Sequence, residues 1–188
     1  MKGKLLATRV WKRTVLMLRN IKVIVAGEKT VGKTSLVEQY TLGKFSGQYS
    51  HSLGLNVTTH IAMAGNRPVK LELWDIAGEY FERTEFYRNA VACMLVYDVT
   101  KEKTLQQLAT WLNVCRTTVP SAGIVVVGNK ADLGYRFPEK WGEFFAKYAN
   151  APHLTASART GENVDLIFSE LAKQALETRD NKSPARGE

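Results

Sequence analysis

This sequence has few cysteines, no long apolar run and an uneven distribution of charge. Only two cysteines occur in 188 residues, Cys93 and Cys115, which is too few for a disulfide framework or a cysteine zinc site and suits a reducing cytosol. No stretch reaches the roughly 18 apolar residues of a membrane-spanning helix. With 45% hydrophobic and 23% charged residues, the chain is typical of one soluble globular domain rather than of a disordered, collagenous or coiled-coil protein.

Acidic residues are absent from the first 19 positions, and this absence explains most of the net charge of +8. Residues 1–19 carry six lysines and arginines, which leaves 8 − 6 = +2 for residues 20–188. The part of the chain expected to fold is therefore nearly balanced in charge. It contains no basic stripe interleaved with aromatic residues, so we expect no nucleic-acid partner.

The two ends of the chain differ in composition from the part between them. Residues 1–19 are expected to be a basic N-terminal extension. Four interpretations of it stay open: a basic amphipathic helix, a mitochondrial transit peptide, an unstructured extension, or an upstream start with Met17 as the working initiator. Residues 179–188 are expected to be a disordered tail, so the folded domain is expected to span residues 20–178.

Short apolar runs alternate with helical patterns between these ends. Nearly continuous Val, Ile and Leu runs predict buried parallel strands at 21–26, 91–96 and 124–127, and the runs at 57–63 and 69–73 predict an antiparallel hairpin around the turn at 65–68. Helical spacing follows over residues 105–115, 141–148 and 164–175, which would put Trp111 and Trp141 in the core. This alternation predicts a three-layer α/β domain with a mostly parallel sheet.

Residues 27–34 (GEKTVGKT) match the phosphate-loop pattern GxxxxGK[ST], directly after a predicted strand and before a helical segment. Backbone N–H groups of such a loop, together with a helix N-terminus, wrap a phosphate. We expect Lys33 to bridge the β- and γ-phosphates and the Thr34 hydroxyl to coordinate Mg²⁺. The nucleotide-binding residues expected here are Glu28, Lys29, Thr30, Val31, Gly32, Lys33, Thr34 and Ser35.

Two later segments bear on which base is bound. Asn129-Lys130-Ala131-Asp132 follows a predicted strand, and a carboxylate there accepts the N1–H and amino group of guanine, which adenine does not present. We expect Asp132 to bind guanine, Asn129 to tie this segment to the phosphate loop, and the Lys130 stem to cover the base. In Ser157-Ala158-Arg159, the Ala158 N–H is expected to reach the guanine O6.

These segments, with residues 155–168 (TASARTGENVDLIF), resemble the Ras superfamily of small GTPases, and specifically its Rab branch. The resemblance covers residues 20–178 and implies a P-loop G domain: a six-stranded, mostly parallel sheet with one antiparallel hairpin strand. It also implies a Mg²⁺-dependent switch that binds GDP and GTP, hydrolyses GTP and works in vesicle or ciliary trafficking. A P-loop kinase or ATPase would bind adenine, which residues 129–132 argue against.

The resemblance extends to WDIAG, residues 74–78, and implies roles for single residues. Asp75 would hold Mg²⁺ through water, and the Gly78 amide would sense the γ-phosphate. Phe45 falls where the family places an aromatic ring over guanine, and Ser52 where it places a threonine that binds Mg²⁺ in the GTP state. Effectors, exchange factors and activating proteins would bind through residues 44–56 and 76–88.

Glu79 departs from the family, because most members have a glutamine there that orients the attacking water. A carboxylate accepts a hydrogen bond from water but donates none to the γ-phosphate. Lys33, Gly78 and Glu79 are thus the expected catalytic residues of a slow GTPase, with Glu79 either a general base or a solvated residue that has lost catalysis. Lys29 would obstruct an arginine finger, or instead lie near the γ-phosphate or pair with Glu79. The alternative function is an effectively non-hydrolysing GTP-binding subunit of a larger transport complex.

The second switch (residues 76–88) and the C-terminus also depart from the family. Of the aromatic residues Tyr80, Phe81, Phe86 and Tyr87, two are expected in the core and the others in an exposed patch for an effector. No cysteine follows Cys115, so no prenyl anchor is expected, and membrane contact would be indirect or through the basic N-terminus. We expect a monomer or complex subunit in the cytoplasm, with a peripheral position at membranes or a cilium left open.

Overall fold

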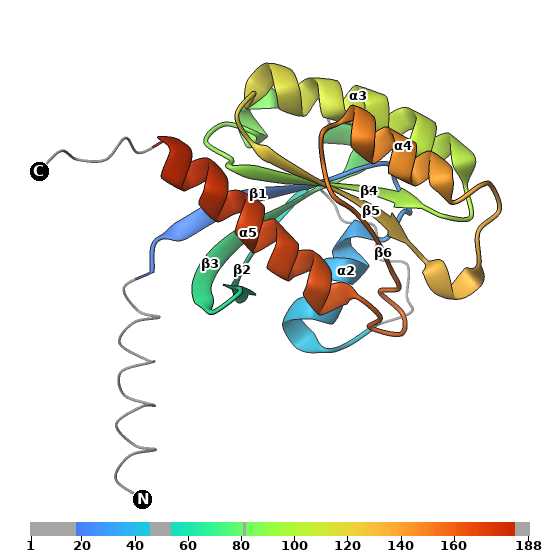
Figure 1. The fold of residues 1–188 in the computed structure, drawn as a ribbon, viewed down its shortest axis with the longest axis horizontal. Coiled ribbons are helices and arrows are strands. Elements are labelled where there is room, and N and C mark those ends of the chain that lie inside the picture. The colour runs from blue at the N-terminus through green and yellow to red at the C-terminus, as the bar shows by residue number, and fades with distance from the viewer. Residues whose placement is uncertain (1–17, 46–53, 81, 183–188) are drawn as a thin grey trace, which may run out of the picture.

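A central six-stranded sheet carries helices on both faces in the computed structural model, which describes residues 18–45, 54–80 and 82–182 (Figure 1). The strands lie in the order β2-β3-β1-β4-β5-β6. The elements are β1 (Asn20–Ala26), α2 (Lys33–Leu42), β2 (Leu55–Ala64), β3 (Arg67–Ile76), β4 (Ala92–Asp98), α3 (Glu102–Thr118), β5 (Gly123–Asn129), α4 (Lys140–Tyr148), β6 (His153–Ala156) and α5 (Val164–Lys182).

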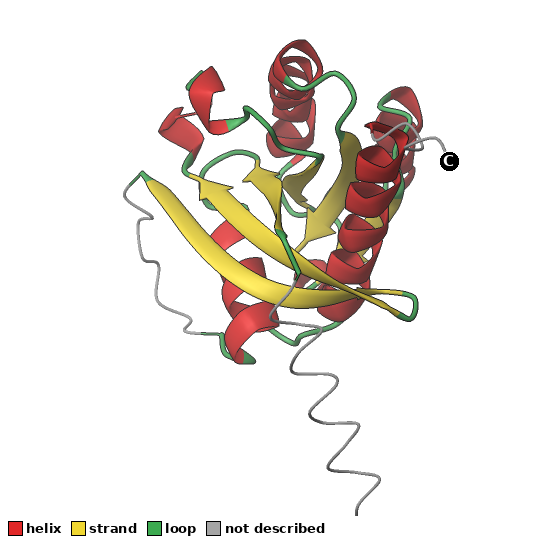
Figure 2. Ribbon diagram, turned by 90° about the vertical axis from the view of Figure 1, so that its left-hand side faces the viewer, coloured by secondary structure: helices red, strands yellow, loops and turns green. Residues whose placement is uncertain are grey.

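Only β2 runs antiparallel to its neighbour, and it pairs with β3 through the tight turn at residues 65–66 (Figure 2). β1 pairs in parallel with β3 and β4, and β5 pairs in parallel with β4 and β6. The expected α/β fold, with a mostly parallel sheet and one antiparallel hairpin strand, is therefore confirmed. The sequence pattern gave no separate signal for β6, because this four-residue edge strand has only one large aliphatic residue, Leu154.

The continuous apolar runs are explained by burial on both faces of the sheet, since all seven residues of β4 are buried. Successive side chains of a strand point to opposite faces. Val23 and Val25 of β1 therefore pack in the core beneath α2 and α5, whereas Ile24 and Ala26 pack in the core beneath α3 and α4. Two hydrophobic layers thus fix the sheet, and the loops at its edges are free to carry the site.

Helix α4 is rotated relative to the expected packing. Trp111 of α3 is buried as predicted, but Trp141 is 39% exposed, and Phe144 and Tyr148 on the same side of α4 are 61% and 79% exposed. The prediction of a core position was therefore wrong for Trp141. The helix instead turns small residues to the sheet, because Tyr97 and His153 already fill the space beneath it; Gly142, Ala146 and Ala149 are the buried positions.

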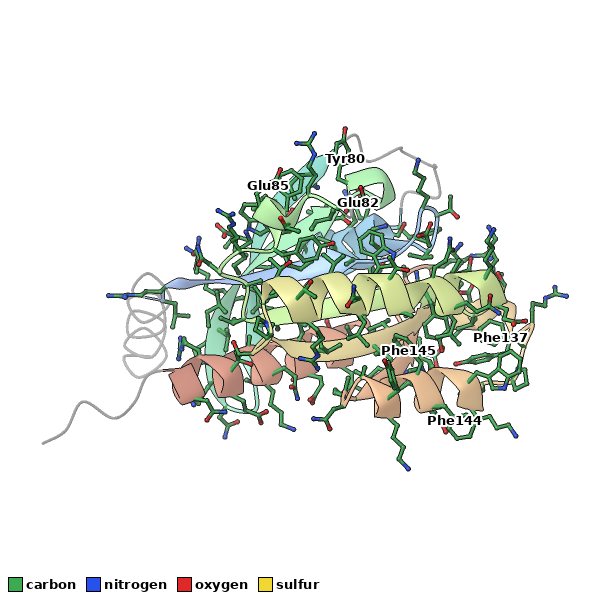
Figure 3. All side chains as sticks on the ribbon, turned by 90° about the horizontal axis from the view of Figure 1, so that it is seen from above. Tyr80, Glu82, Glu85, Phe137, Phe144 and Phe145 are labelled. Carbon is green, nitrogen blue, oxygen red and sulfur yellow. The ribbon has the colours of Figure 1, made fainter. Side chains whose placement is uncertain are left out.

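The segment after β3 forms two short 3₁₀ turns, Gly78–Tyr80 and Thr84–Phe86. Tyr87 is completely buried in the core beneath α3, and Tyr80 and Phe86 are half-buried against it, while Phe81 lies outside the described residues. Two of the four rings were expected in the core and two at the surface, but all three described rings pack against the core and form no exposed aromatic patch. The surface of this segment is charged instead, with Glu82, Arg83, Glu85 and Arg88 exposed; Tyr80, Glu82 and Glu85 can be found in Figure 3.

The last helix is longer than the sequence predicts. α5 continues to Lys182 and so includes the first four residues of the predicted disordered tail, while residues 183–188 lie outside the description. Two contacts join the end of this helix to the sheet: the Thr178 hydroxyl accepts a hydrogen bond from the Gly123 N–H at 3.2 Å, and Asp180, within the extension, forms an exposed ion pair with Arg67 at 3.4 Å. Among the described residues, no helix has the length and apolar character that crossing a bilayer requires.

Replacing Gly142 by alanine tests the packing of α4. Alanine normally stabilises a helix interior by about 0.5–1 kcal/mol relative to glycine. A Cβ at this position would instead overlap the Tyr97 hydroxyl and lie 2.7 Å from His153 Nε2. We expect Gly142→Ala to lower the free energy of unfolding by about 1–3 kcal/mol, measured by urea denaturation, because overpacking costs that much. Adding Tyr97→Phe should recover part of the loss; a Gly142→Ala variant more stable than the wild type would contradict this packing.

Candidate functional site

Three strands of the sheet end at the same edge, and the loops that follow them carry the predicted site residues. In a parallel sheet, ligands bind in the crevice at the carboxyl ends of the strands. The loop after β1 contains residues 27–32, the loop after β4 contains residues 99–101, and the loop after β5 contains residues 130–134. The sequence-predicted phosphate and base segments therefore meet on one side of the fold.

The phosphate loop has an unusual backbone that places it against the next loop. Gly32 has φ +94°, and Thr30, although β-branched, has φ +67°. A Cβ on Gly32 would overlap the Asn129 side-chain nitrogen, so only glycine lets Asn129 approach the loop here. A positive φ at a residue such as threonine is strained and persists only where neighbouring contacts hold it.

Lys33 is buried at the start of α2, with 6% of its surface exposed. Its Nζ donates hydrogen bonds to the carbonyl oxygens of Gly27 at 2.8 Å and Glu28 at 2.9 Å. Burial lowers the pKa of Lys33, while the carboxylates of Asp75 and Glu28 act in the opposite direction. The ammonium is thus held inside the phosphate loop, where it can meet an anionic ligand.

Thr34 and Asp75 meet beside this ammonium. The Thr34 hydroxyl donates a hydrogen bond to Asp75 Oδ2, and Asp75 Oδ1 is buried without a hydrogen-bond partner among the described residues. Burial raises the pKa of Asp75, although Thr34 and Lys33 act to lower it. A buried carboxylate oxygen without a partner is satisfied by a cation, and a hydroxyl with a carboxylate suits Mg²⁺. These two residues fit the expected ion.

Asn129 joins three segments by its side chain alone. Its Nδ2 donates a hydrogen bond to the Val31 carbonyl at 2.8 Å, and its Oδ1 accepts one from the Ala158 N–H at 3.1 Å. The expected tie to the phosphate loop is therefore present. The Ala158 N–H, expected to reach the guanine O6, is used here by Asn129, because the two loops lie close enough for this direct bond.

Asp132 is held in place by the segment after β6. The Ser157 hydroxyl donates to Asp132 Oδ1 at 2.6 Å and accepts from the Thr160 N–H at 3.1 Å. Arg159 lies 3.8 Å from Asp132 Oδ2, and its side chain is mostly exposed. Asp132, Ser157 and Arg159 are thus brought together as expected, with the Asp132 carboxylate oriented by a serine rather than by backbone alone.

The remaining predicted site residues have fewer described contacts or lie outside the described residues. Gly78 packs against the phosphate loop, since a Cβ there would lie 2.9 Å from Lys29 Cγ and 3.0 Å from its backbone nitrogen. Phe45 is 43% exposed, and Ser35 is half-buried in the first turn of α2. Ser52 and the side chain of Glu79 lie outside the described residues.

Two polar residues of the site were not identified from the sequence. Asp98, the last residue of β4, is fully buried and accepts a hydrogen bond from Lys130 Nζ at 2.6 Å. Its signal in the sequence is an acid that closes an otherwise apolar strand. Trp111 of α3 donates its indole N–H to the Glu28 carboxylate at 3.3 Å, which links the phosphate loop to that helix.

Comparison with known proteins agrees with this geometry. The Ras family model matches residues 22–177. The chain is 36% identical to Ras-related protein Rab-26 of Drosophila melanogaster over 82% of its own length but only 42% of that protein. It is 35% identical to Drosophila Ras-related protein Rab7, covering 84% of this chain and 81% of that one, and 34% identical to human Ras-related protein Rab-4B, covering 85% and 78%. The chain belongs to the Ras family and is a Rab-like small GTPase of the Ras superfamily.

Proposed function

We propose that this protein is a Mg²⁺-dependent guanine-nucleotide switch that hydrolyses GTP slowly and works in intracellular trafficking. The observation that carries the proposal is the Asn129 side chain, which holds the phosphate loop at Val31 and the segment after β6 at Ala158. We infer that the phosphate loop and Asp132, the carboxylate proposed to select guanine, bind the two ends of one nucleotide. The Asp132 carboxylate favours guanine over adenine, because it accepts the N1–H and the amino group that adenine does not present.

The phosphate end is proposed to bind through Lys33 and the backbone amides of the phosphate loop. An ammonium has three N–H donors. Two of those of Lys33 go to loop carbonyls, which aims the third toward a phosphate oxygen. Thr34 and Asp75 would hold Mg²⁺, which when bound neutralises charge on the β- and γ-phosphates.

Slow hydrolysis is proposed from the residues around Gly78. The family's water-orienting glutamine is replaced by Glu79, whose carboxylate cannot donate a hydrogen bond to the γ-phosphate. Gly78 lies against Lys29 in the phosphate loop. The bulky Lys29 side chain would therefore obstruct an arginine finger that an activating protein inserts toward the γ-phosphate. Both features lower turnover, the first within the protein and the second in complexes with activating proteins.

Partners are proposed to recognise residues 44–56 and 76–88, whose conformation depends on the nucleotide in switches of this kind. The described part of the second segment offers charged side chains rather than aromatic rings to such a partner. Effectors, exchange factors and activating proteins are the expected partner classes, and we place the protein in the cytoplasm, acting at membranes through those partners.

Asp132→Asn tests the base assignment. An amide donates where the carboxylate accepts, so we expect the affinity for GDP to fall about 100-fold and an affinity for xanthosine diphosphate to appear, since unpaired polar groups carry such discrimination. Titration with a fluorescent analogue of each nucleotide measures both constants. Asp165→Asn is the matched control, since it makes the same change at an exposed acid in the first turn of α5, and it should change the preference little. Loss of GDP binding with no gain of xanthosine diphosphate binding, or adenine binding by the wild type, would contradict the assignment.

Thr34→Ala tests the cation site. We expect chelation with EDTA to accelerate GDP release from the wild type about tenfold, or about 1.4 kcal/mol, since the ion helps to hold the phosphates. In Thr34→Ala, release in Mg²⁺ should already be fast and EDTA should change it less than about twofold. Stopped-flow fluorescence in Mg²⁺ and in EDTA gives the four rates. An identical EDTA response in both proteins would remove Thr34 from the cation site.

Glu79→Gln tests the reason for slow turnover. An amide both accepts from water and donates to the γ-phosphate, so single-turnover hydrolysis should rise about tenfold over the wild type. Glu79→Ala is the control, because it removes the charge without supplying a donor, and it should gain less. No turnover in the wild type, with tight GTP binding retained, would favour the non-hydrolysing subunit, and a lower rate in Glu79→Gln would favour Glu79 as a general base.

A further inference from the structure

Asp98 is a buried carboxylate that none of the nucleotide-binding segments described above contains. It ends β4 with no exposed surface, and an ionised carboxylate in such a place is costly unless it is paired and hydrogen-bonded. Its register explains where it points, because Asp98 lies directly beside Asn129 in the β4–β5 ladder. The residue after Asn129 is Lys130, so strand pairing alone puts this acid next to the loop at residues 130–134.

Both carboxylate oxygens of Asp98 are occupied. Oδ1 accepts the Thr100 N–H at 2.9 Å and the Thr100 hydroxyl at 2.6 Å. This pair of bonds fixes the carboxylate plane and leaves Oδ2 facing Lys130 Nζ at 2.6 Å. The Asp98 carboxylate is therefore held rigidly before it accepts the hydrogen bond from Lys130. A surface ion pair differs, because two long side chains lose conformational entropy when they form it.

Lys130 uses the same ammonium to reach the phosphate loop. Its Nζ donates to the Thr30 carbonyl at 2.7 Å, across a separation of one hundred residues in the sequence. Thr30 and Lys130 both have positive φ, +67° and +70°, so one ammonium joins two strained backbone positions. Without Asp98 this cation would have no acid beside it in the described part of the site and could turn outward to water.

We propose that Asp98 is a positioning residue that holds the Lys130 ammonium against the Thr30 carbonyl and thereby lengthens the residence time of a bound guanine nucleotide. The proposal rests on the proposed function and extends it from residues that contact the nucleotide to one that acts through Lys130. It also brings α3 into the site, because the Asp98 N–H donates to the hydroxyl of Thr104 in the first turn of that helix at 3.0 Å.

The primary experiment is GDP release from Asp98→Asn. Asparagine keeps the shape and still accepts from Thr100, but it removes the charge that faces Lys130. We expect GDP to dissociate about tenfold faster than from the wild type, in line with the strength of charge-assisted hydrogen bonds. Glu102→Gln is the matched control, since it removes one negative charge from the first turn of α3 without touching Lys130, and its release rate should stay at the wild-type value.

A double-mutant cycle separates positioning from general destabilisation. If Asp98 acts through Lys130, then Asp98→Asn added to Lys130→Met should change GDP release by less than about twofold, because the shared interaction is already lost. Multiplicative effects of the two substitutions, or an unchanged release rate in Asp98→Asn with GDP bound tightly, would overturn the proposal. Failure of every variant and of the wild type to bind GDP would instead refute the proposed function.

Hydrogen exchange of the nucleotide-free protein tests the same contact without any ligand. The backbone amides of residues 29–33 should exchange faster in Asp98→Asn than in the wild type, and equally fast in Lys130→Met and in the double variant. Amides of β3, which Asp98 does not touch, report whether the whole fold has been weakened. Unchanged exchange at residues 29–33 in Asp98→Asn would overturn the proposal whatever the nucleotide experiments give.

Discussion

The buried side chain of Asn129 is the interaction on which the rest of the site depends. An amide buried without partners is unfavourable, so its two hydrogen bonds, to the Val31 carbonyl and from the Ala158 N–H, fix the distance between loops that are far apart in the chain. The missing Cβ of Gly32 is the matching constraint, because any larger residue would overlap the same amide. One side chain and one glycine thus set the geometry within which every other site residue is placed.

The strained backbone of the site and the positive charges of its lysines stabilise each other. The positive φ angles of Thr30 and Lys130 each cost of the order of 1–3 kcal/mol, and the ammonium groups of Lys33 and Lys130 are drawn away from water onto loop carbonyls. Neither arrangement would persist alone. The two lysine ammonium groups hold the strained phosphate loop in place by their hydrogen bonds to its carbonyls. Those carbonyls and the nearby carboxylates in turn stabilise the positive charges. The protein's own contacts are therefore enough to form the site.

Local patterns in the sequence were enough to predict the five longer strands and the phosphate loop, because each depends on neighbours in the chain or on a short motif. The tie made by Asn129 was expected from the short motif at residues 129–132. The failures concern residues whose environment is set by distant segments. Trp141 was expected in the core, but Tyr97 and His153 occupy the space beneath α4 and turn Gly142 inward. Asp98 belongs to no local motif, and its position in the site follows only from the strand register that puts it beside Asn129.

The second switch shows how such long-range packing limits motion as well as position. At one end Gly78 lies against the backbone of Lys29, and at the other the completely buried Tyr87 is enclosed in the core beneath α3. Pulling Tyr87 out would expose a large aromatic surface, whereas the charged residues between, such as Glu82 and Arg83, lose little on moving through water. Tyr87 is therefore held in the core beneath α3, whereas Glu82 and Arg83 lie at the surface, where a partner can contact their charges.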